Sequence, residues 1–192
     1  MRKWFLPLAL ICSLAVGVLS GCATTPKYQQ GKAIVAYFSA TGNTEAIAEG
    51  VAKLTHGDLY KITPAVPYSK ADLYAKNADS RIVIEQKEPK VRPPLASAPA
   101  TLDPYDIIYI GYPIWYGQAP RLIYTFIEKY DLKDKTIVPF CTSHQTGLGP
   151  SAEALKELAP KALWKEGHGF FEDDDLEDIE QWLQQIHAEP KL

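Results

Sequence analysis

Short continuous apolar runs alternate along the chain with segments of helical periodicity. The apolar runs predict strands buried on both faces of a parallel sheet, and they occupy residues 33–38, 107–110 and 136–141. Apolar positions at helical spacing predict helices at residues 44–54, 122–130, 151–158 and 176–186. Alternation at residues 58–62 suits a sheet-edge strand, and residues 162–164 predict a short last strand. This order of elements indicates an α/β fold with a parallel sheet.

Residues 64–104 are the least regular part of the chain. Prolines at positions 64, 67, 89, 93, 94, 99 and 104 disfavour a compact helix or a central strand. We therefore expect a long covering loop, with a short helix near residues 70–78 and a mixed run at residues 81–85. Insertions of this length often carry function.

The turn between the first strand and its helix is rich in hydrogen-bond donors. It consists of Ser39, Ala40, Thr41, Gly42, Asn43 and Thr44. Backbone N–H groups, hydroxyls and the positive end of a helix converge there, which predicts a site for an anionic group such as a phosphate. The alternative is that the hydroxyls only cap the helix. A Walker loop is excluded because the turn lacks a Gly-Lys-Ser/Thr ending.

Two further loops follow buried strands and carry candidate ligand-binding residues. The loop after the strand at 107–110 contains Pro113, Ile114, Trp115, Tyr116 and Gly117, and the loop after the strand at 136–141 contains Thr142, Ser143, His144 and Gly147. The two rings beside Pro and Gly would expose apolar surface unless a flat ligand covered them or both packed into the core. Ligands of open α/β sheets bind outside the carboxyl ends of the strands, at the switch point between the strands at 33 and 107.

The wider spacing around the first turn resembles the flavodoxin signature. Matching positions are Val35, Tyr37, Ser39, Gly42, Thr44, Ala48 and Val51, and Ala36 departs from the pattern. The resemblance implies a three-layer sandwich over residues 32–188, with a five-stranded parallel sheet of order 2-1-3-4-5. It also implies flavin mononucleotide (FMN), with its phosphate held by neutral hydroxyls and amides.

The resemblance assigns roles to the other loops as well. Trp115 and Tyr116 are expected to border the isoalloxazine ring, and the peptide between Tyr116 and Gly117 to reorient as the flavin takes up a proton. The 142–149 loop resembles the one that closes over the pyrimidine end of the flavin, but departs at His144 and Gln145. A long insertion occurs in a similar flavodoxin-like subgroup, and within it Tyr68 is expected to pack, with flavin contact as the alternative.

The first 31 residues predict export and anchoring. Residues 1–21 have a basic start, an apolar stretch and the sequence Leu19-Ser20-Gly21 before Cys22, which matches a bacterial lipobox. We expect residues 1–21 to be a signal peptide, Cys22 to be lipidated, and residues 22–31 to form the lipidated Cys and tether. A retained transmembrane anchor is the alternative. The expected location is the cell envelope, on the outer side of the cytoplasmic membrane or in the periplasm.

Composition narrows the function classes. Residues 22–192 hold 18 basic and 23 acidic residues, a net charge of −5, which argues against nucleic acid as a partner. The four histidines lack metal-ligand spacing.

The acidic run at 172–175 suits the start of the last helix, with an acidic docking patch as the alternative. A receiver domain would need acidic residues where Phe38 and Ser39 stand.

Two functions stay open from sequence alone. The first is an electron carrier whose FMN exchanges electrons with a redox partner protein or the membrane quinone pool. The second is an FMN-dependent oxidoreductase that uses NAD(P)H to reduce quinones or nitro compounds. The carrier is favoured because pyridine nucleotides are scarce outside the cytoplasm.

Overall fold

A computed structural model describes residues 31–188. The signal sequence and Cys22 therefore lie outside the described residues. Within residues 31–188, no helix has the length and apolar character needed to cross a membrane.

The centre of the molecule is a parallel sheet. Its strands are β1 (Ala33–Tyr37), β2 (Asp58–Lys61), β3 (Ile107–Pro113), β4 (Thr136–Thr142), β5 (Leu163–Trp164) and β6 (His168–Phe170). The order is β2-β1-β3-β4-β5, and β6 also pairs with β4, in parallel like every other pair. The predicted order 2-1-3-4-5 is confirmed.

The far edge of the sheet holds two short strands where the sequence predicts one. β5 pairs with the start of β4 and β6 with its end, so they occupy the same position in the sheet one after the other. Pro139 of β4 lies between the two pairings and has no N–H to donate to the ladder. Gly167 passes so close that a Cβ there would lie 2.3 Å from the Pro139 carbonyl oxygen. The proline and the glycine together explain the interruption.

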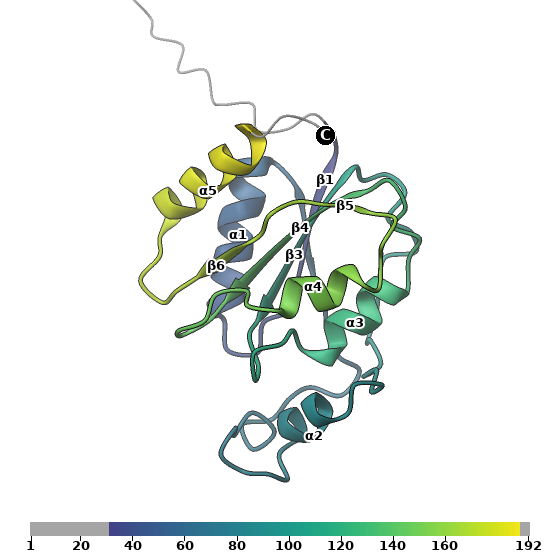
Figure 1. The fold of residues 1–192 in the computed structure, drawn as a ribbon, viewed down its shortest axis with the longest axis vertical. Helices are drawn as coiled ribbons and strands as arrows, with labels where there is room; N and C mark the ends of the chain where they lie inside the picture. The colour runs from purple at the N-terminus through teal and green to yellow at the C-terminus, as the bar shows by residue number, and fades with distance from the viewer. Residues whose placement is uncertain (1–30, 189–192) are drawn as a thin grey trace, which may run out of the picture.

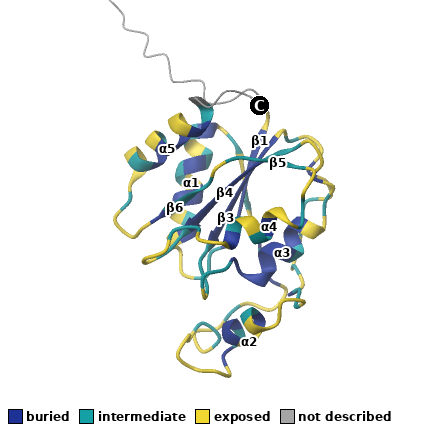
Figure 2. Cartoon of the chain, in the orientation of Figure 1, coloured by how far each residue is buried: buried dark blue, intermediate teal, exposed yellow. Residues whose placement is uncertain are grey.

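Helices cover both faces of the sheet (Figure 1). On one face lie α1 (Asn43–Thr55) and α5 (Leu176–Ala188), and on the other α3 (Arg121–Glu128) and α4 (Ser151–Lys156). Each face has its own core, because alternate residues of β1 point in opposite directions: Val35 packs with α1 and α5, and Ile34 with α3 and α4. Figure 2 shows the central strands β1, β3 and β4 buried and the outer sides of these helices exposed. These are the three layers that the sequence predicts.

The insertion at residues 64–104 carries the remaining helix, α2 (Arg81–Lys87), away from the sheet (Figure 1). The helix predicted near residues 70–78 is wrong, because that stretch is a series of turns. Ser69 and Asp72 satisfy each other's backbone N–H groups there, which favours a turn. Helix formation begins instead at residue 81, supported by an Arg81–Glu85 ion pair of 2.6 Å and by burial of Ile82 and Val83.

Candidate functional site

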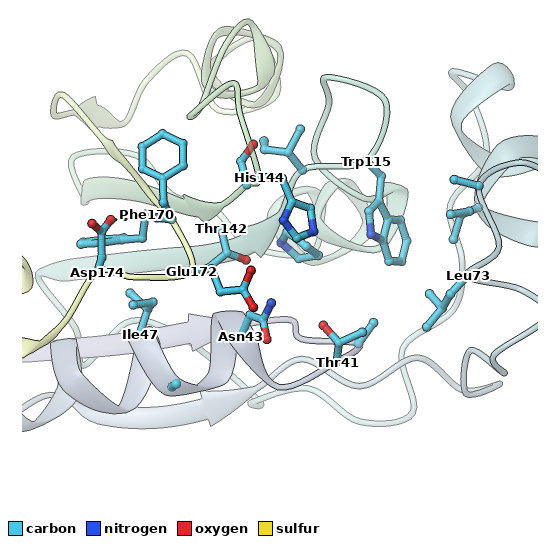
Figure 3. A pocket seen from close by; sticks show the side chains of 18 residues that line it. Thr41, Asn43, Ile47, Leu73, Trp115, Thr142, His144, Phe170, Glu172 and Asp174 are labelled. Atoms are coloured by element: carbon cyan, nitrogen blue, oxygen red, sulfur yellow. Dashed lines mark hydrogen bonds between the residues drawn. The ribbon is translucent and has the colours of Figure 1, made fainter.

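A cavity of about 390 Å³ opens at the carboxyl edge of the sheet. It falls within the size range of small-molecule sites, roughly 300 to 1,000 Å³. All three candidate loops contribute to its lining, through Ala40, Thr41, Asn43, Pro113, Ile114, Trp115, Thr142, Ser143 and His144. Figure 3 shows Thr41 and Asn43 on one side, Trp115 and His144 facing them, and Leu73 and Asp174 toward opposite ends.

The first loop turns sharply so that α1 begins at the cavity. Gly42 has a φ of 101°, in the region that glycine adopts without steric cost, and its N–H donates to Ser39 Oγ at 3.0 Å. Ser39 and Gly42 therefore shape the turn and do not line the cavity. The Thr41 hydroxyl and the Asn43 amide do line it, beside the positive end of α1. These groups suit an anion.

Thr44 does not face the cavity, although its hydroxyl made it a candidate for binding the anion. Its side chain is buried, and Thr44 Oγ1 lies 2.7 Å from Thr142 Oγ1 on β4. Thr44 therefore links the first loop to the third and does not itself line the cavity.

Charge near this end of α1 is already paired. Glu45 accepts hydrogen bonds from Lys61 Nζ at 2.9 Å and from the Tyr37 hydroxyl at 2.7 Å. The Lys61 bond, followed by the Tyr37 bond, holds the pKa of Glu45 below its ordinary value. The carboxylate stays ionised but is directed toward these partners. No lysine or arginine lines the cavity within the described residues, so the first loop offers an anion neutral donors, while the acidic side chains of the lining, Glu172 and Asp174, come from the segment after β6.

The second loop presents Trp115 to the cavity and turns Tyr116 away from it. Tyr116 and Gly117 both have positive φ, 51° and 75°, between two backbone hydrogen bonds that join Trp115 and Gln118. These are the features of a type I′ turn. The Tyr116 hydroxyl donates to the Ala75 carbonyl of the insertion, and the residue as a whole is 55% exposed. Tyr116 and Gly117 thus lie beside the cavity without lining it.

The third loop is folded by its own hydroxyls. Ser143 Oγ accepts from the backbone N–H groups of Gln145 and Thr146, at 3.3 and 3.1 Å, and this leaves His144 at the cavity. Gly147 packs against β6, where a Cβ on Gly169 would lie 2.4 Å from the Gly147 Cα. The missing Cβ of Gly169 therefore permits this close packing, and Gly147, whose φ is 52°, does not line the cavity.

Comparison with known proteins identifies the family. The model of the family described as Flavodoxin matches residues 32–186. The chain belongs to the flavodoxin family. No match was found among curated proteins.

Solved structures agree with this membership. A protein of Bacteroides eggerthii assigned as a flavoprotein is 46% identical, with a TM-score of 0.78 over 83% of this chain and 100% of that one. One of Bacteroides uniformis with the same assignment is 40% identical, with a TM-score of 0.77 over 81% and 99%. A flavoprotein of Lactobacillus acidophilus NCFM, solved in complex with FMN, shares the fold at 22% identity, with a TM-score of 0.61 over 80% and 99%.

This flavodoxin also has cavity residues that its sequence did not reveal. Leu73, Ala75 and Ile82 come from the insertion, and Phe170, Phe171, Glu172 and Asp174 come from β6 and the segment after it. The sequence pattern predicts no strand at residues 168–170, and the acidic run at residues 172–175 suits the start of the last helix. That role is confirmed for Asp175, whose carboxylate accepts from Glu177 N at 2.7 Å ahead of α5. The apolar Phe170 after Gly169 is the only residue of this stretch whose type favours a strand.

Reactive side chains are few around this flavodoxin's cavity. Burial raises the pKa of the Cys141 thiol to about 12, so it stays a neutral thiol. Within residues 31–188, no three His, Cys, Asp or Glu side chains are grouped to hold a metal ion. The cavity therefore offers neutral donors, a flat aromatic ring, apolar walls and the carboxylates of Glu172 and Asp174.

Proposed function

We propose that this flavodoxin binds FMN and carries electrons between proteins at the cell envelope, where a lipid on Cys22 anchors it. One observation carries the proposal. Neutral donors at the positive end of α1 lie in the same cavity as the flat ring of Trp115. A phosphate attached to a planar heterocycle matches both features at once.

The side chains fit FMN in separate parts of the cavity. Thr41 and Asn43 would hold the phosphate, Trp115 would cover the isoalloxazine, and Ser143 and His144 would lie toward its pyrimidine end. FMN supplies reversible one- and two-electron transfer when it is bound. The FMN complex of the Lactobacillus acidophilus flavoprotein supports the choice of FMN through the shared fold. In this arrangement Trp115 and the residues of the first and third loops would orient the ring.

The direction of the chain favours a protein as the redox partner. The cavity lies at the carboxyl ends of the strands, whereas the chain enters β1 at the opposite, amino-terminal end of the sheet (Figure 1). Residues 23–31 can span at most roughly 30 Å when fully extended. A domain anchored through them carries its cavity on the side away from the attachment point. This arrangement presents the flavin to proteins of the envelope more readily than to quinones within the anchoring bilayer.

The anchor is tested on its own residue. Cys22→Ser should abolish incorporation of radiolabelled palmitate and signal cleavage, and the chain should no longer be processed as a lipoprotein. The signal lacks a twin arginine, so we propose that the chain crosses the membrane unfolded and binds FMN afterwards. Flavin-loaded protein that still reaches the envelope with the general export channel blocked would refute that route.

A second candidate function is FMN-dependent reduction of quinones or nitro compounds by NAD(P)H. It is favoured by the apolar side chains of Leu73, Ala75 and Ile82, which give the cavity a wall that a small aromatic acceptor can contact. Stopped-flow mixing of the FMN-loaded full-length protein with NADPH separates the two functions. The carrier predicts no reduction within seconds, whereas rapid bleaching followed by reoxidation with a quinone establishes the enzyme.

A further inference from the structure

Three aromatic rings meet between the insertion and the cavity. The Tyr68 ring lies with its centroid 5.2 Å from that of Trp115, at an interplanar angle of 74°. Phe38, the residue that follows β1, contacts both rings, with its centroid 5.5 Å from that of Trp115 and 5.6 Å from that of Tyr68. Trp115 lines the cavity, but Tyr68 and Phe38 do not. The indole therefore faces the cavity while these two rings pack against it from behind.

Tyr68 is fixed by an ion pair from α2. Its hydroxyl donates to Glu85 Oε2 at 2.6 Å, and Arg81 Nε donates to the other carboxylate oxygen, also at 2.6 Å. The Arg81 guanidinium also lies over the Tyr68 ring, 4.0 Å from its centroid. Burial, followed by the hydrogen bond to Glu85, raises the pKa of Tyr68, so the phenol remains a donor at physiological pH.

The helix that carries this ion pair is itself attached to the body of the domain. The Arg121 guanidinium donates to the carbonyl oxygens of Glu85 and Gln86, at 3.3 and 3.1 Å, and Gln86 Nε2 donates to the Ala119 carbonyl at 3.1 Å. Ala119 and Arg121 follow directly after the Trp115 loop. The insertion therefore braces that loop from two sides, through α2 and through Tyr68.

We infer that Tyr68 is a positioning residue for Trp115. By packing on the indole, Tyr68 sets the orientation that Trp115 presents to the cavity, and through it the relative affinity for oxidised and reduced flavin. This inference deepens the proposed function and rests on it. It gives the insertion a specific role, which is to transmit its packing to the flavin through a residue that does not line the cavity.

The first test follows Trp115 directly and needs no flavin. Full-length protein labelled with 5-fluorotryptophan gives a ¹⁹F resonance for Trp115, assigned by its loss in Trp115→Phe. Tyr68→Ala should shift or broaden that resonance, while those of Trp164 and Trp182 stay in place because they lie on β5 and α5. Tyr68→Phe keeps the ring but loses the hydrogen bond to Glu85, so its Trp115 resonance should lie nearer the parent's position than that of Tyr68→Ala. An unchanged Trp115 resonance in Tyr68→Ala overturns the inference.

A matched control removes a different tyrosine that joins the insertion to the domain. Tyr130 is also half-buried, and its hydroxyl donates to the Pro99 carbonyl at 2.8 Å, while its ring packs on Phe126. Tyr130→Ala therefore loosens the far end of the insertion, and the Trp115 resonance should stay where it is. If Tyr68→Ala does not fold, Tyr68→Leu fills the volume without the aromatic ring and should also displace the resonance.

The second test measures FMN binding in a double-mutant cycle. Aromatic pairs contribute about 0.5 to 1.5 kcal/mol, so Tyr68→Ala should change the ratio of the Kd values for oxidised and reduced FMN by roughly 2- to 12-fold. A tenfold change corresponds to about 30 mV for a two-electron couple. In the Trp115→Ala background, Tyr68→Ala should have no further effect, because the residue through which it acts is gone.

The outcomes distinguish this inference from the proposed function. An effect of Tyr68→Ala that persists undiminished without Trp115 overturns the positioning role and leaves FMN binding intact. A parent protein that binds no FMN overturns the proposed function, and with it the flavin readout, whereas the fluorine spectrum still decides whether Tyr68 positions Trp115.

Discussion

Replacing Thr41 and Thr44 one at a time separates the two tasks of the first loop. The two hydroxyls are three residues apart, yet the structure gives them different surroundings. Thr41 is exposed at the cavity, whereas Thr44 is 1% exposed and its hydroxyl lies 2.7 Å from that of Thr142. We therefore expect one substitution to change FMN affinity and the other to change stability.

The expected magnitudes follow from the partner that each hydroxyl has. A hydrogen bond to a charged group contributes about 1.5 to 3 kcal/mol, so Thr41→Ala should weaken FMN binding by about one to two decades. Its effect on the unfolding free energy of the flavin-free protein should be within about 0.5 kcal/mol, as for other surface substitutions. Thr44→Val keeps the volume but removes the bond to Thr142, and should destabilise the flavin-free protein by about 1 to 3 kcal/mol.

The two effects are measured on the same samples. Quenching of FMN fluorescence on titration gives the Kd, and urea unfolding monitored by tryptophan fluorescence gives the stability of the flavin-free protein. A Thr41→Ala variant with the parent's Kd would refute the phosphate role of the first loop. A Thr44→Val variant as stable as the parent would show that the threonine pair contributes nothing to folding.

Three further predictions concern the second loop and the far edge of the sheet. Trp115→Ala should raise the flavin midpoint potential, because it removes an electron-rich ring that disfavours reduced flavin. Tyr116→Phe loses only the hydrogen bond to the Ala75 carbonyl, and it should keep the parent's potential in the same redox titration. Gly117→Ala forces an L-residue into a φ of 75° and should cost about 1 to 2 kcal/mol in urea unfolding, although a Cβ there meets no atom within 4 Å. Burial lowers the pKa of His168 below 6.5, so proton NMR should find its titration below that value. Its contribution to stability should be complete above pH 6.5 and decline as the pH falls, and the decline should be smaller in His168→Phe, where His187, whose pKa burial also lowers, still titrates.

Most of the sheet could be predicted from the sequence because its strands are buried on both faces. Continuous apolar runs such as those of β1 and β3 have few alternatives once helical patterns separate them. The edge is different. β6 has only three residues, His168, Gly169 and Phe170, and no run of that length stands out from a loop. β6 pairs with β4 only beyond Pro139, which interrupts the hydrogen bonding of β4. The periodicity of residues 168–170 cannot detect an interruption on another strand.

The bounds of the insertion could be predicted from the sequence, but the position of its helix could not. Its prolines indicate a covering segment, but the position of α2 depends on tertiary contacts. Arg121 donates to the carbonyls at the end of that helix from the start of α3, and Glu85 is buried only because Tyr68 and Arg81 satisfy it. The Arg121 contact joins residues 36 positions apart and the Tyr68 contact joins residues 17 positions apart, and a local pattern contains no information about either.

For the site, the positions of the loops could be predicted from the sequence, but the orientations of the side chains within them could not. All three predicted loops reach one cavity, because carboxyl ends of parallel strands share an edge. Which hydroxyl or ring faces the cavity depends on backbone turns that form only in the folded chain. The type I′ turn directs Tyr116 to Ala75, and burial directs Thr44 to Thr142.

Identification of the flavin released from the protein tests the central claim most directly. Full-length protein purified in detergent, or reconstituted after export, would be denatured and the released cofactor separated by chromatography against FMN, FAD and riboflavin standards. We predict FMN at one molecule per chain, with a Kd that weakens in Thr41→Ala. Release of FAD, or an absence of flavin together with no FMN uptake by the folded protein, would contradict the account.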